Sequence, residues 1–232
     1  VFIHGAGGSC RFWKAQVEGL TGNVNAVALD LPGHGESAGA GMGSIADYAG
    51  SVEEFIDAIH APFPVPCGLS MGGAITLQML LGGKKYNAGI VINSGARLKV
   101  MPFIFDLIKN DYQGYVNSLT SVGISVKTDP SKLQDVIADT RKCNPDVVYN
   151  DFMACNAFDI MGRLHEITAP LLVLTADEDK LSPAKYGKYI AEHITGAGMV
   201  NIMEAGHMSP VEKPDQVNRA ILEFMDNPGE PV

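Results

Sequence analysis

The chain has 232 residues, of which 46% are hydrophobic and 19% charged, enough to bury a large core as one domain with an inserted subdomain. The formal net charge is −9 and Lys and Arg form no cluster, which argues against a nucleic-acid partner or an anionic membrane surface. No run of 18 apolar residues occurs, so no membrane span is expected.

Six short apolar runs end in turn residues and predict β-strands at residues 1–3, 25–31, 64–69, 88–93, 169–175 and 199–204. The runs are apolar almost throughout, as expected for strands buried on both faces of a parallel sheet. Helices are predicted at residues 44–60, 71–81, 182–194 and 214–225. Two of them have clear starts, with Ser44 as N-cap and Asp47 three residues on, and with Ser182 as N-cap before Pro183. The alternation predicts an α/β fold with a doubly wound, mostly parallel sheet.

Residues 97–168 interrupt this alternation, because three helical patterns follow one another there without a strand. The dipeptides Asp129-Pro130 and Asn144-Pro145 separate the patterns. The segment is too long for a loop in a compact domain. We therefore predict an α/β core of residues 1–96 and 169–232 with a helical cap, residues 97–168, inserted between two strands.

The pattern G-x-S-x-G, which can mark the nucleophile of a hydrolase, occurs twice, at residues 35–39 and 68–72. A nucleophile elbow needs a strand before the serine, a helix after it, and glycines that remove Cβ clashes at the sharp turn. Ser70 meets these conditions. Ser37 follows "DLPGHG" and precedes "AGAGMG", whose glycines break helices. Ser70 is therefore the predicted nucleophile, and Ser37 is predicted to lie in a loop.

A serine hydroxyl needs a base before it becomes an effective nucleophile. Among six histidines, His207 lies in a turn directly after the last predicted strand, far along the chain from Ser70, and is the predicted base. The others are interpreted as surface residues (His60, His165 and His193) or as residues that brace glycine-containing loops (His4 and His34).

The base needs a carboxylate that fixes its tautomer and stabilises its charged form. The turn "TADEDKLSP" after the strand at 169–175 offers Asp177, Glu178 and Asp179. Asp179 stands four residues before Pro183 and is favoured as the acid, with Asp177 as the alternative.

Acyl transfer also needs N–H donors for the developing oxyanion. The segment "HGAGGS" at residues 4–9 follows the first strand, and its glycines let backbone amides face the site. The N–H groups of Ala6 and Met71 are the predicted donors. A phosphate-binding G-x-G-x-x-G loop is not expected, because Cys10 stands where the third glycine is required.

The four cysteines, Cys10, Cys67, Cys143 and Cys155, lack metal-site spacing, and free thiols in a reducing compartment are expected. A cytoplasmic location follows as an expectation. Because the sequence starts at Val1 without a methionine, a removed signal peptide stays open.

These pieces together resemble the α/β-hydrolase superfamily, in which the triad follows the chain order seen in Ser70, Asp179 and His207. The segments "VFIHGAGG", "DLPGHGES", "GLSMGG", "EDKLSP" and "AGHMSPVEKPDQV" are similar to its motifs and occur in its order. Esterases, cofactor-free haloperoxidase-like enzymes and proline iminopeptidases are the most similar branch. Two features depart from the family pattern: no hairpin precedes Val1, which would leave the strand at 25–31 at an edge, and Ala176 stands where a glycine is common.

The resemblance implies a serine hydrolase that cleaves a carboxylic ester of short to medium acyl length through an acyl-enzyme, without metal or cofactor. Its partner would be a small-molecule acyl substrate, and the cap would be a lid whose Met101, Phe103 and Phe158 contact that substrate. Serine at the elbow argues against dehalogenases and epoxide hydrolases, which use a carboxylate. Alternatives are a thioester, lactone or carbon–carbon bond hydrolase or a lyase using the same site, or a non-catalytic ligand-binding receptor on this scaffold.

Overall fold

A computed structural model describes residues 1–84 and 86–228 of the chain. Six strands form one sheet in the order β2-β1-β3-β4-β5-β6, and every neighbouring pair is parallel. The strands are β1 (Phe2–Ile3), β2 (Ala28–Leu29), β3 (Cys67–Leu69), β4 (Gly89–Ile92), β5 (Leu171–Ala176) and β6 (Ala197–Ile202). The predicted parallel sheet is confirmed, and β2 lies at its edge.

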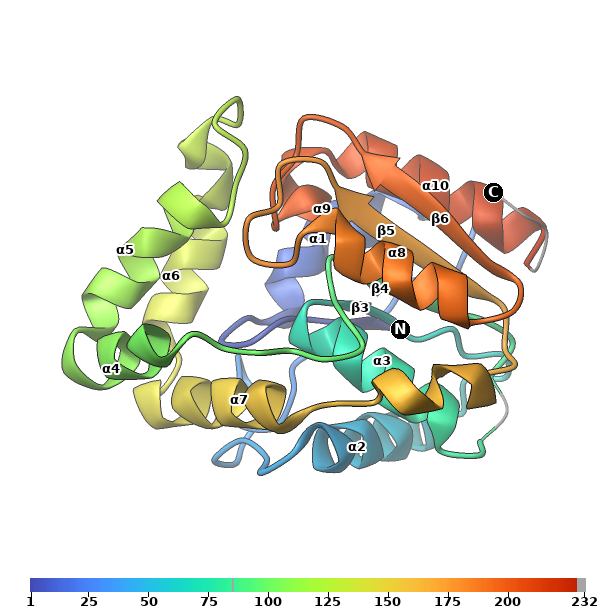
Figure 1. The fold of residues 1–232 in the computed structure, drawn as a ribbon, viewed down its shortest axis with the longest axis horizontal. Helices are drawn as coiled ribbons and strands as arrows, with labels where there is room; N and C mark the ends of the chain where they lie inside the picture. Colours follow the sequence, from blue (N-terminus) through green and yellow to red (C-terminus); the bar gives the residue numbers. More distant parts are fainter. Residues whose placement is uncertain (85, 229–232) are drawn as a thin grey trace.

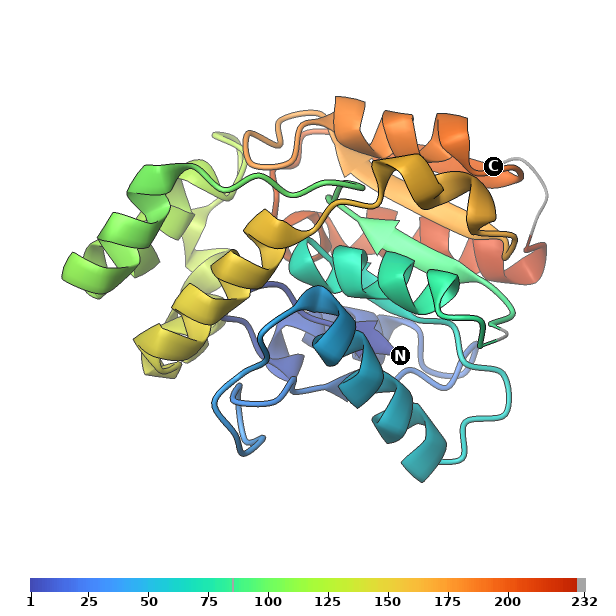
Figure 2. The ribbon, with the colours of Figure 1, turned by 60° about the horizontal axis from the view of Figure 1, so that its bottom comes forward.

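Helices cover both faces of this sheet (Figures 1 and 2). On one face α1 (Lys14–Gly19) and α10 (Pro214–Asp226) contribute to a hydrophobic cluster that contains Trp13, Leu20 and Phe224. On the other face α2 (Ile45–Ala58), α3 (Met71–Leu81) and α8 (Ala184–His193) build a second cluster. The sheet is therefore doubly wound, and its central strands are buried on both sides.

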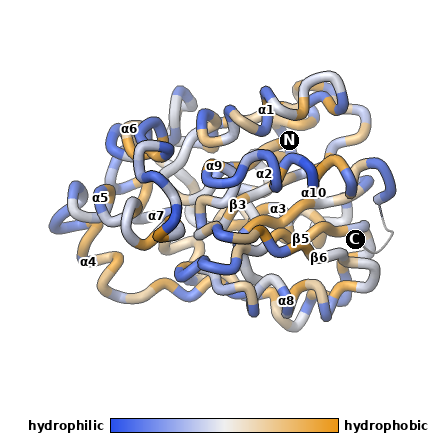
Figure 3. The backbone as a smooth tube through the Cα atoms, turned by 90° about the horizontal axis from the view of Figure 1, so that it is seen from above, coloured by the Kyte–Doolittle hydropathy of each residue, from blue (hydrophilic) through white to orange (hydrophobic). Residues whose placement is uncertain are grey.

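The position of each helix explains its hydropathy. In Figure 3 the tube is orange along most of α3, whereas α10 alternates between blue and orange. Helix α3 is buried on nearly all sides because it lies between the sheet and α2. Helix α10 buries only one face, with Val217, Ile221 and Phe224 turned toward the core. The described helices include none that is long and apolar enough to cross a bilayer.

Two helix starts test the capping predictions. The side chain of Ser44 accepts a hydrogen bond from the Asp47 N–H and caps α2, as predicted. Ser182 does not cap α8, whose N-cap position is taken by Pro183. This prediction was wrong: the helix begins one residue later than expected, and the Ser182 N–H donates to Oδ1 of Asp179.

Four helices lie between β4 and β5 in the chain: α4 (Pro102–Asn110), α5 (Tyr112–Val122), α6 (Gln134–Lys142) and α7 (Pro145–Ala157). In Figure 1 α4, α5 and α6 stand on the side toward which the arrows of β5 and β6 point. We call residues 97–168 the cap. Its entry and exit segments pair through Arg97 and Asp159, which also form an ion pair at 2.7 Å. The division into core and cap stays a prediction, and residues 229–232 of the predicted core lie outside the described residues.

Candidate active site

Ser70 sits on the sharp turn between β3 and α3 with φ of 55° and ψ of −116°. A residue other than glycine adopts positive φ only where its surroundings enforce it. Here two hydrogen bonds do so: the Ser70 N–H donates to the carbonyl of Ile92, and the Ser94 hydroxyl donates to the carbonyl of Ser70 at 2.7 Å. The side chain is half-buried at the carboxyl end of β3.

The glycines around Ser70 are required by close backbone approach. A Cβ on Gly68 would overlap the carbonyl oxygen of Gly72, and a Cβ on Gly72 would overlap the carbonyl oxygen of Ile3. The G-x-S-x-G match at residues 35–39 has a different environment, since Ser37 is exposed in a loop and its hydroxyl donates to the Asp30 carbonyl. The structure therefore gives only the match at residues 68–72 the strand–turn–helix setting.

His207 and Asp179 form a buried pair. The Nδ1 atom of His207 lies 2.9 Å from Oδ2 of Asp179, and the two residues are 5% and 6% exposed. The other carboxylate oxygen, Oδ1, accepts hydrogen bonds from the N–H groups of Leu181 and Ser182. Burial alone would raise the pKa of Asp179, but the charge and hydrogen bond of His207 and the two amides outweigh it, so the pKa is lowered.

Asp177, the alternative acid, points elsewhere. Its residue is exposed, and Oδ1 accepts a hydrogen bond from the N–H of Ala205 at 3.2 Å. The carboxylate thus fastens the turn before His207 and does not contact the imidazole. The geometry favours Asp179 over Asp177 as the partner of His207.

Asn93 and Ser94 connect the turns of Ser70 and His207, and sequence reasoning missed both. Asn93 follows β4, is 1% exposed and has φ of 45°. Its Nδ2 donates to the carbonyl of His207 at 2.9 Å and to the hydroxyl of Ser209 at 2.8 Å, while Ser94 binds the Ser70 carbonyl. Two polar residues directly after a central apolar strand were the signal available in the sequence.

The loop of residues 4–9, which we call the oxyanion loop, lies against Ser70. A Cβ on Gly5 would stand 3.4 Å from the Cβ of Ser70. Within the described residues, the N–H groups of Ala6 and Met71 have no hydrogen-bond acceptor on the protein. Unpaired amides are the donors that an oxyanion hole requires, and this role of Ala6 and Met71 stays a prediction.

His4 braces this loop, as the sequence predicted. Its Nδ1 lies 2.8 Å from the carbonyl of Gly5, and Nε2 accepts from the Leu31 N–H at 3.1 Å. The ring is therefore neutral with its proton on Nδ1. Burial, followed by the charge of His34, lowers the pKa of His4 to about 4, against the opposing effects of Asp151 and Asp30.

A neutral buried histidine makes stability depend on pH. Because the folded pKa of about 4 is below the ordinary value of 6.5, the unfolded chain binds more protons between these pH values. The contribution of His4 is fully present above pH 6.5 and is lost as pH falls toward 4. We expect the free energy of unfolding to fall by about 2 kcal/mol less between pH 7 and pH 5 in His4→Gln than in the parent. Urea unfolding of both proteins at the two pH values measures this; equal losses would contradict a neutral His4.

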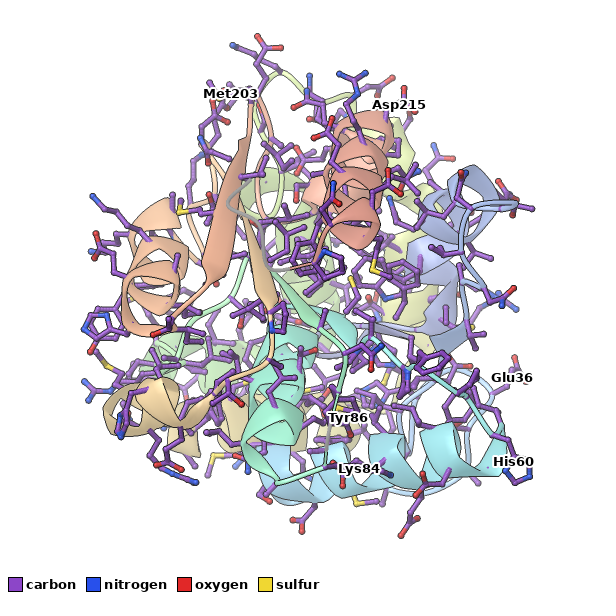
Figure 4. The ribbon with its side chains drawn as sticks, turned by 90° about the vertical axis from the view of Figure 1, so that its right-hand side faces the viewer. Glu36, His60, Lys84, Tyr86, Met203 and Asp215 are labelled. Carbon is purple, nitrogen blue, oxygen red and sulfur yellow. The ribbon has the colours of Figure 1, made fainter. Side chains whose placement is uncertain are left out.

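The remaining histidines and the cysteines offer no second site. His60, His165 and His193 are exposed, and Figure 4 shows His60 projecting from a corner of the molecule. All four cysteines are free. Burial raises the pKa of Cys67, three residues before Ser70, to about 12, so its thiol stays protonated. In residues 1–84 and 86–228 no group of three His, Cys, Asp or Glu side chains could hold a metal ion.

The three predicted substrate-contacting residues have different environments. Met101 and Phe103 are 63% and 55% exposed at the start of α4. Phe158 is 6% exposed and belongs to the hydrophobic cluster formed with α2, α3 and α8. In this structure it is a core packing residue. Substrate contact by these residues stays a prediction.

Comparisons with known proteins agree with the fold. Residues 1–220 match the alpha/beta hydrolase family. The chain is 28% identical, over 97% of its length, to the dihydrolipoyllysine-residue acetyltransferase component of the acetoin cleaving system of Pseudomonas putida, but spans only 62% of that protein. It is 25% identical to 3-oxoadipate enol-lactonase 2 of Acinetobacter baylyi, over 97% of this chain and 87% of that one.

Among solved structures, an esterase from Thermogutta terrifontis superposes with a TM-score of 0.89 at 21% identity, over 98% of this chain and 89% of that one. This likeness concerns the fold. The family match over residues 1–220 shows that the chain belongs to the alpha/beta hydrolase family. The protein is therefore classed as a hydrolase.

Proposed function

We propose that this hydrolase cleaves carboxylic esters of short to medium acyl length by a two-step acyl transfer. The observation that carries the proposal is the buried His207–Asp179 hydrogen bond. It lies, like Ser70 with its positive φ, at the carboxyl ends of the strands. The names of an enol-lactonase and an esterase among the similar proteins support it, since a lactone is a cyclic ester.

Each residue has a defined role in this mechanism. Ser70 attacks the carbonyl carbon while His207 takes its proton, and Asp179 keeps the Nδ1–H of His207 in place and stabilises the imidazolium. The N–H groups of Ala6 and Met71 bind the negative oxygen of the tetrahedral intermediate. His207 then protonates the leaving alcohol, and in the second step it activates the water that releases the acid.

The substrate is proposed to be a small acyl compound that reaches Ser70 beneath the cap, and the reaction to take place in the cytoplasm. Met101 and Phe103 are apolar and exposed at the start of α4, which suits contact with an acyl chain. Their role is testable through the dependence of kcat/KM on acyl length.

A labelling experiment tests the proposal without a variant. We expect a fluorophosphonate to modify one residue, Ser70, as identified by peptide mass spectrometry, and to abolish hydrolysis of p-nitrophenyl esters in proportion to labelling. A panel from acetate to decanoate then gives the preferred acyl length. Labelling of Ser70 without turnover of any ester or thioester would favour a lyase, and retention of a small molecule with negligible turnover would favour a receptor.

A further inference from the structure

A buried carboxylate of the cap contacts the oxyanion loop. Asp151 lies in α7 and is 0% exposed. Its Oδ2 accepts a hydrogen bond from the N–H of Gly7 at 2.9 Å and lies 2.8 Å from Nε2 of His34. Its Oδ1 accepts from the hydroxyl of Tyr48 at 2.5 Å. Donors from three separate core segments thus converge on one side chain of the cap, and this carboxylate has no part in the mechanism above.

Both ring nitrogens of His34, one of the three donors around Asp151, have hydrogen-bond partners. Its Nδ1 lies 3.1 Å from the carbonyl of Pro32, and its Nε2 faces Asp151, so both ring nitrogens face acceptors. Both ring nitrogens are therefore placed to donate a hydrogen bond. Burial disfavours the charged imidazole, but the hydrogen bond and charge of Asp151 exceed this effect and raise the pKa of His34. Asp151 thus lies within hydrogen-bond distance of three donors of the core.

The hydrogen bond from the Gly7 N–H to Asp151 restrains the backbone of the oxyanion loop at a glycine, where several φ and ψ values are sterically allowed. Gly7 has φ of 65°, a conformation that glycine enters and leaves easily. Its amide points at the cap, while the preceding residue, Ala6, supplies an amide with no acceptor on the described protein. A Cβ on Gly7 would stand 3.1 Å from Val148, so α7 also packs directly on this residue.

The same loop is held at its far end by a second carboxylate of the cap. The hydroxyl of Ser9 donates to Oδ2 of Asp139 in α6 at 2.7 Å. Within the core, the loop has the hydrogen bonds of Gly8 N–H and His4 Nδ1 to the carbonyl of Gly5. The Ala6 N–H shares a peptide plane with the Gly5 carbonyl, which these core contacts hold. The following peptide, between Ala6 and Gly7, is held by Asp151 of α7.

We propose that Asp151 is a positioning residue for the oxyanion hole: it holds the peptide that follows Ala6, and so limits movement of the Ala6 amide together with the core contacts of the peptide before it. The cap then contributes to transition-state stabilisation as well as covering the site. This inference rests on the proposed function, because it assigns Ala6 the oxyanion-binding role given there.

The test is Asp151→Ala, which removes both acceptor oxygens, so that the Gly7 N–H loses its acceptor. Asp151→Asn would not test the proposal, because its single oxygen can serve the N–H groups of Gly7 and His34 while its NH2 group donates to the Tyr48 hydroxyl. We expect kcat for p-nitrophenyl butyrate to fall about 10- to 100-fold, since displacement of a catalytic group by about 1 Å has effects of this size. KM should change less than about twofold, because the ground-state ester does not need the oxyanion donors. The affinity of an alkyl boronic acid, which forms a tetrahedral anionic adduct on the serine, should fall in parallel with kcat.

Tyr48→Phe is the matched control. It removes another hydrogen bond from the same buried carboxylate but leaves the bond to Gly7, so kcat should stay within about threefold of the parent even if the protein is destabilised. A second measurement uses the parent alone: the Gly7 amide hydrogen should exchange slowly with solvent. Fast exchange would overturn the proposal even if Asp151→Ala did not fold.

The outcomes separate this inference from the proposed function. If Ser70→Ala is inactive while Asp151→Ala keeps the parental kcat and boronic acid affinity, only the positioning role is wrong. An equal loss of kcat in Tyr48→Phe and Asp151→Ala would also overturn it, because a general effect of the buried cluster would then explain both. If Ser70→Ala hydrolyses the ester as fast as the parent, the proposed function itself fails.

Discussion

Replacement of Ser70 by alanine is expected to lower kcat for p-nitrophenyl butyrate roughly 10⁶-fold, to the level left by binding and the oxyanion donors alone. The hydroxyl is the atom that forms the acyl-enzyme, and no nearby group can replace it, since the thiol of Cys67 is buried in β3 and stays protonated. The fold should be unaffected, because the Ser70 contacts that hold the turn are made by its backbone N–H and carbonyl. The measurement is the steady-state rate of a preparation free of parental enzyme.

Ser37→Ala is the matched control for this prediction. Ser37 lies in the other G-x-S-x-G match, and its hydroxyl makes a single bond to the Asp30 carbonyl at an exposed position. Its activity should stay within about twofold of the parent, as is usual for a surface substitution away from a site. Parental activity in Ser70→Ala, or a loss confined to Ser37→Ala, would refute the assignment of the nucleophile.

The parts of this protein that the sequence predicted are those fixed by local chemistry. The central strands β4 and β5 are apolar runs bounded by turn residues, and helix α3 was predicted with its observed bounds because Ser70 and Gly82 limit it. Ser70 was distinguished from Ser37 because only one of them follows a strand and precedes a helix. The glycines at 68 and 72 carried this information, since each is required by a backbone contact that no other residue allows.

The parts that were missed depend on contacts between distant segments. Helix α1 was not predicted because it has only six residues and gains its stability from packing against α10. Ser182 was predicted to be a cap, but its amide is used by Asp179. Asp151 could not be recognised, because its partner Gly7 lies far along the chain. Asn93 left a signal as a polar residue after an apolar strand, but its partner His207 also lies far along the chain.

A second buried carboxylate joins cap and core on the histidine side of the site. Glu212, in α9 (Ser209–Glu212), is 1% exposed. It accepts from the Ser125 N–H at 2.8 Å, from the Thr128 hydroxyl at 2.7 Å and from the Gly206 N–H at 2.9 Å. The cap residues Ser125 and Thr128 are thereby linked to the turn that carries His207. Together with Asp151, this places a cap-to-core carboxylate contact beside each of the two loops that serve Ser70.

Asp179→Asn is expected to lower kcat about 10⁴-fold while leaving the fold intact. Both oxygens of Asp179 act as acceptors: Oδ1 takes the N–H groups of Leu181 and Ser182, and Oδ2 faces Nδ1 of His207. An asparagine has one oxygen, and the two amides require it, so its NH2 group must face the imidazole. Nδ1 then becomes an acceptor, the ring proton moves to Nε2, and His207 can no longer take the proton of Ser70.

Asp177→Asn is the matched control, in the same turn and two residues away. Asp177 uses a single oxygen, which accepts from the Ala205 N–H, and an asparagine oxygen can replace it. We expect kcat within about threefold of the parent for this variant. The measurement is kcat for p-nitrophenyl butyrate together with the rate of fluorophosphonate labelling, which should fall with kcat in Asp179→Asn because both reactions need a deprotonated Ser70. A large loss in Asp177→Asn with normal activity in Asp179→Asn would assign the acid to Asp177 and overturn the role given to the buried pair.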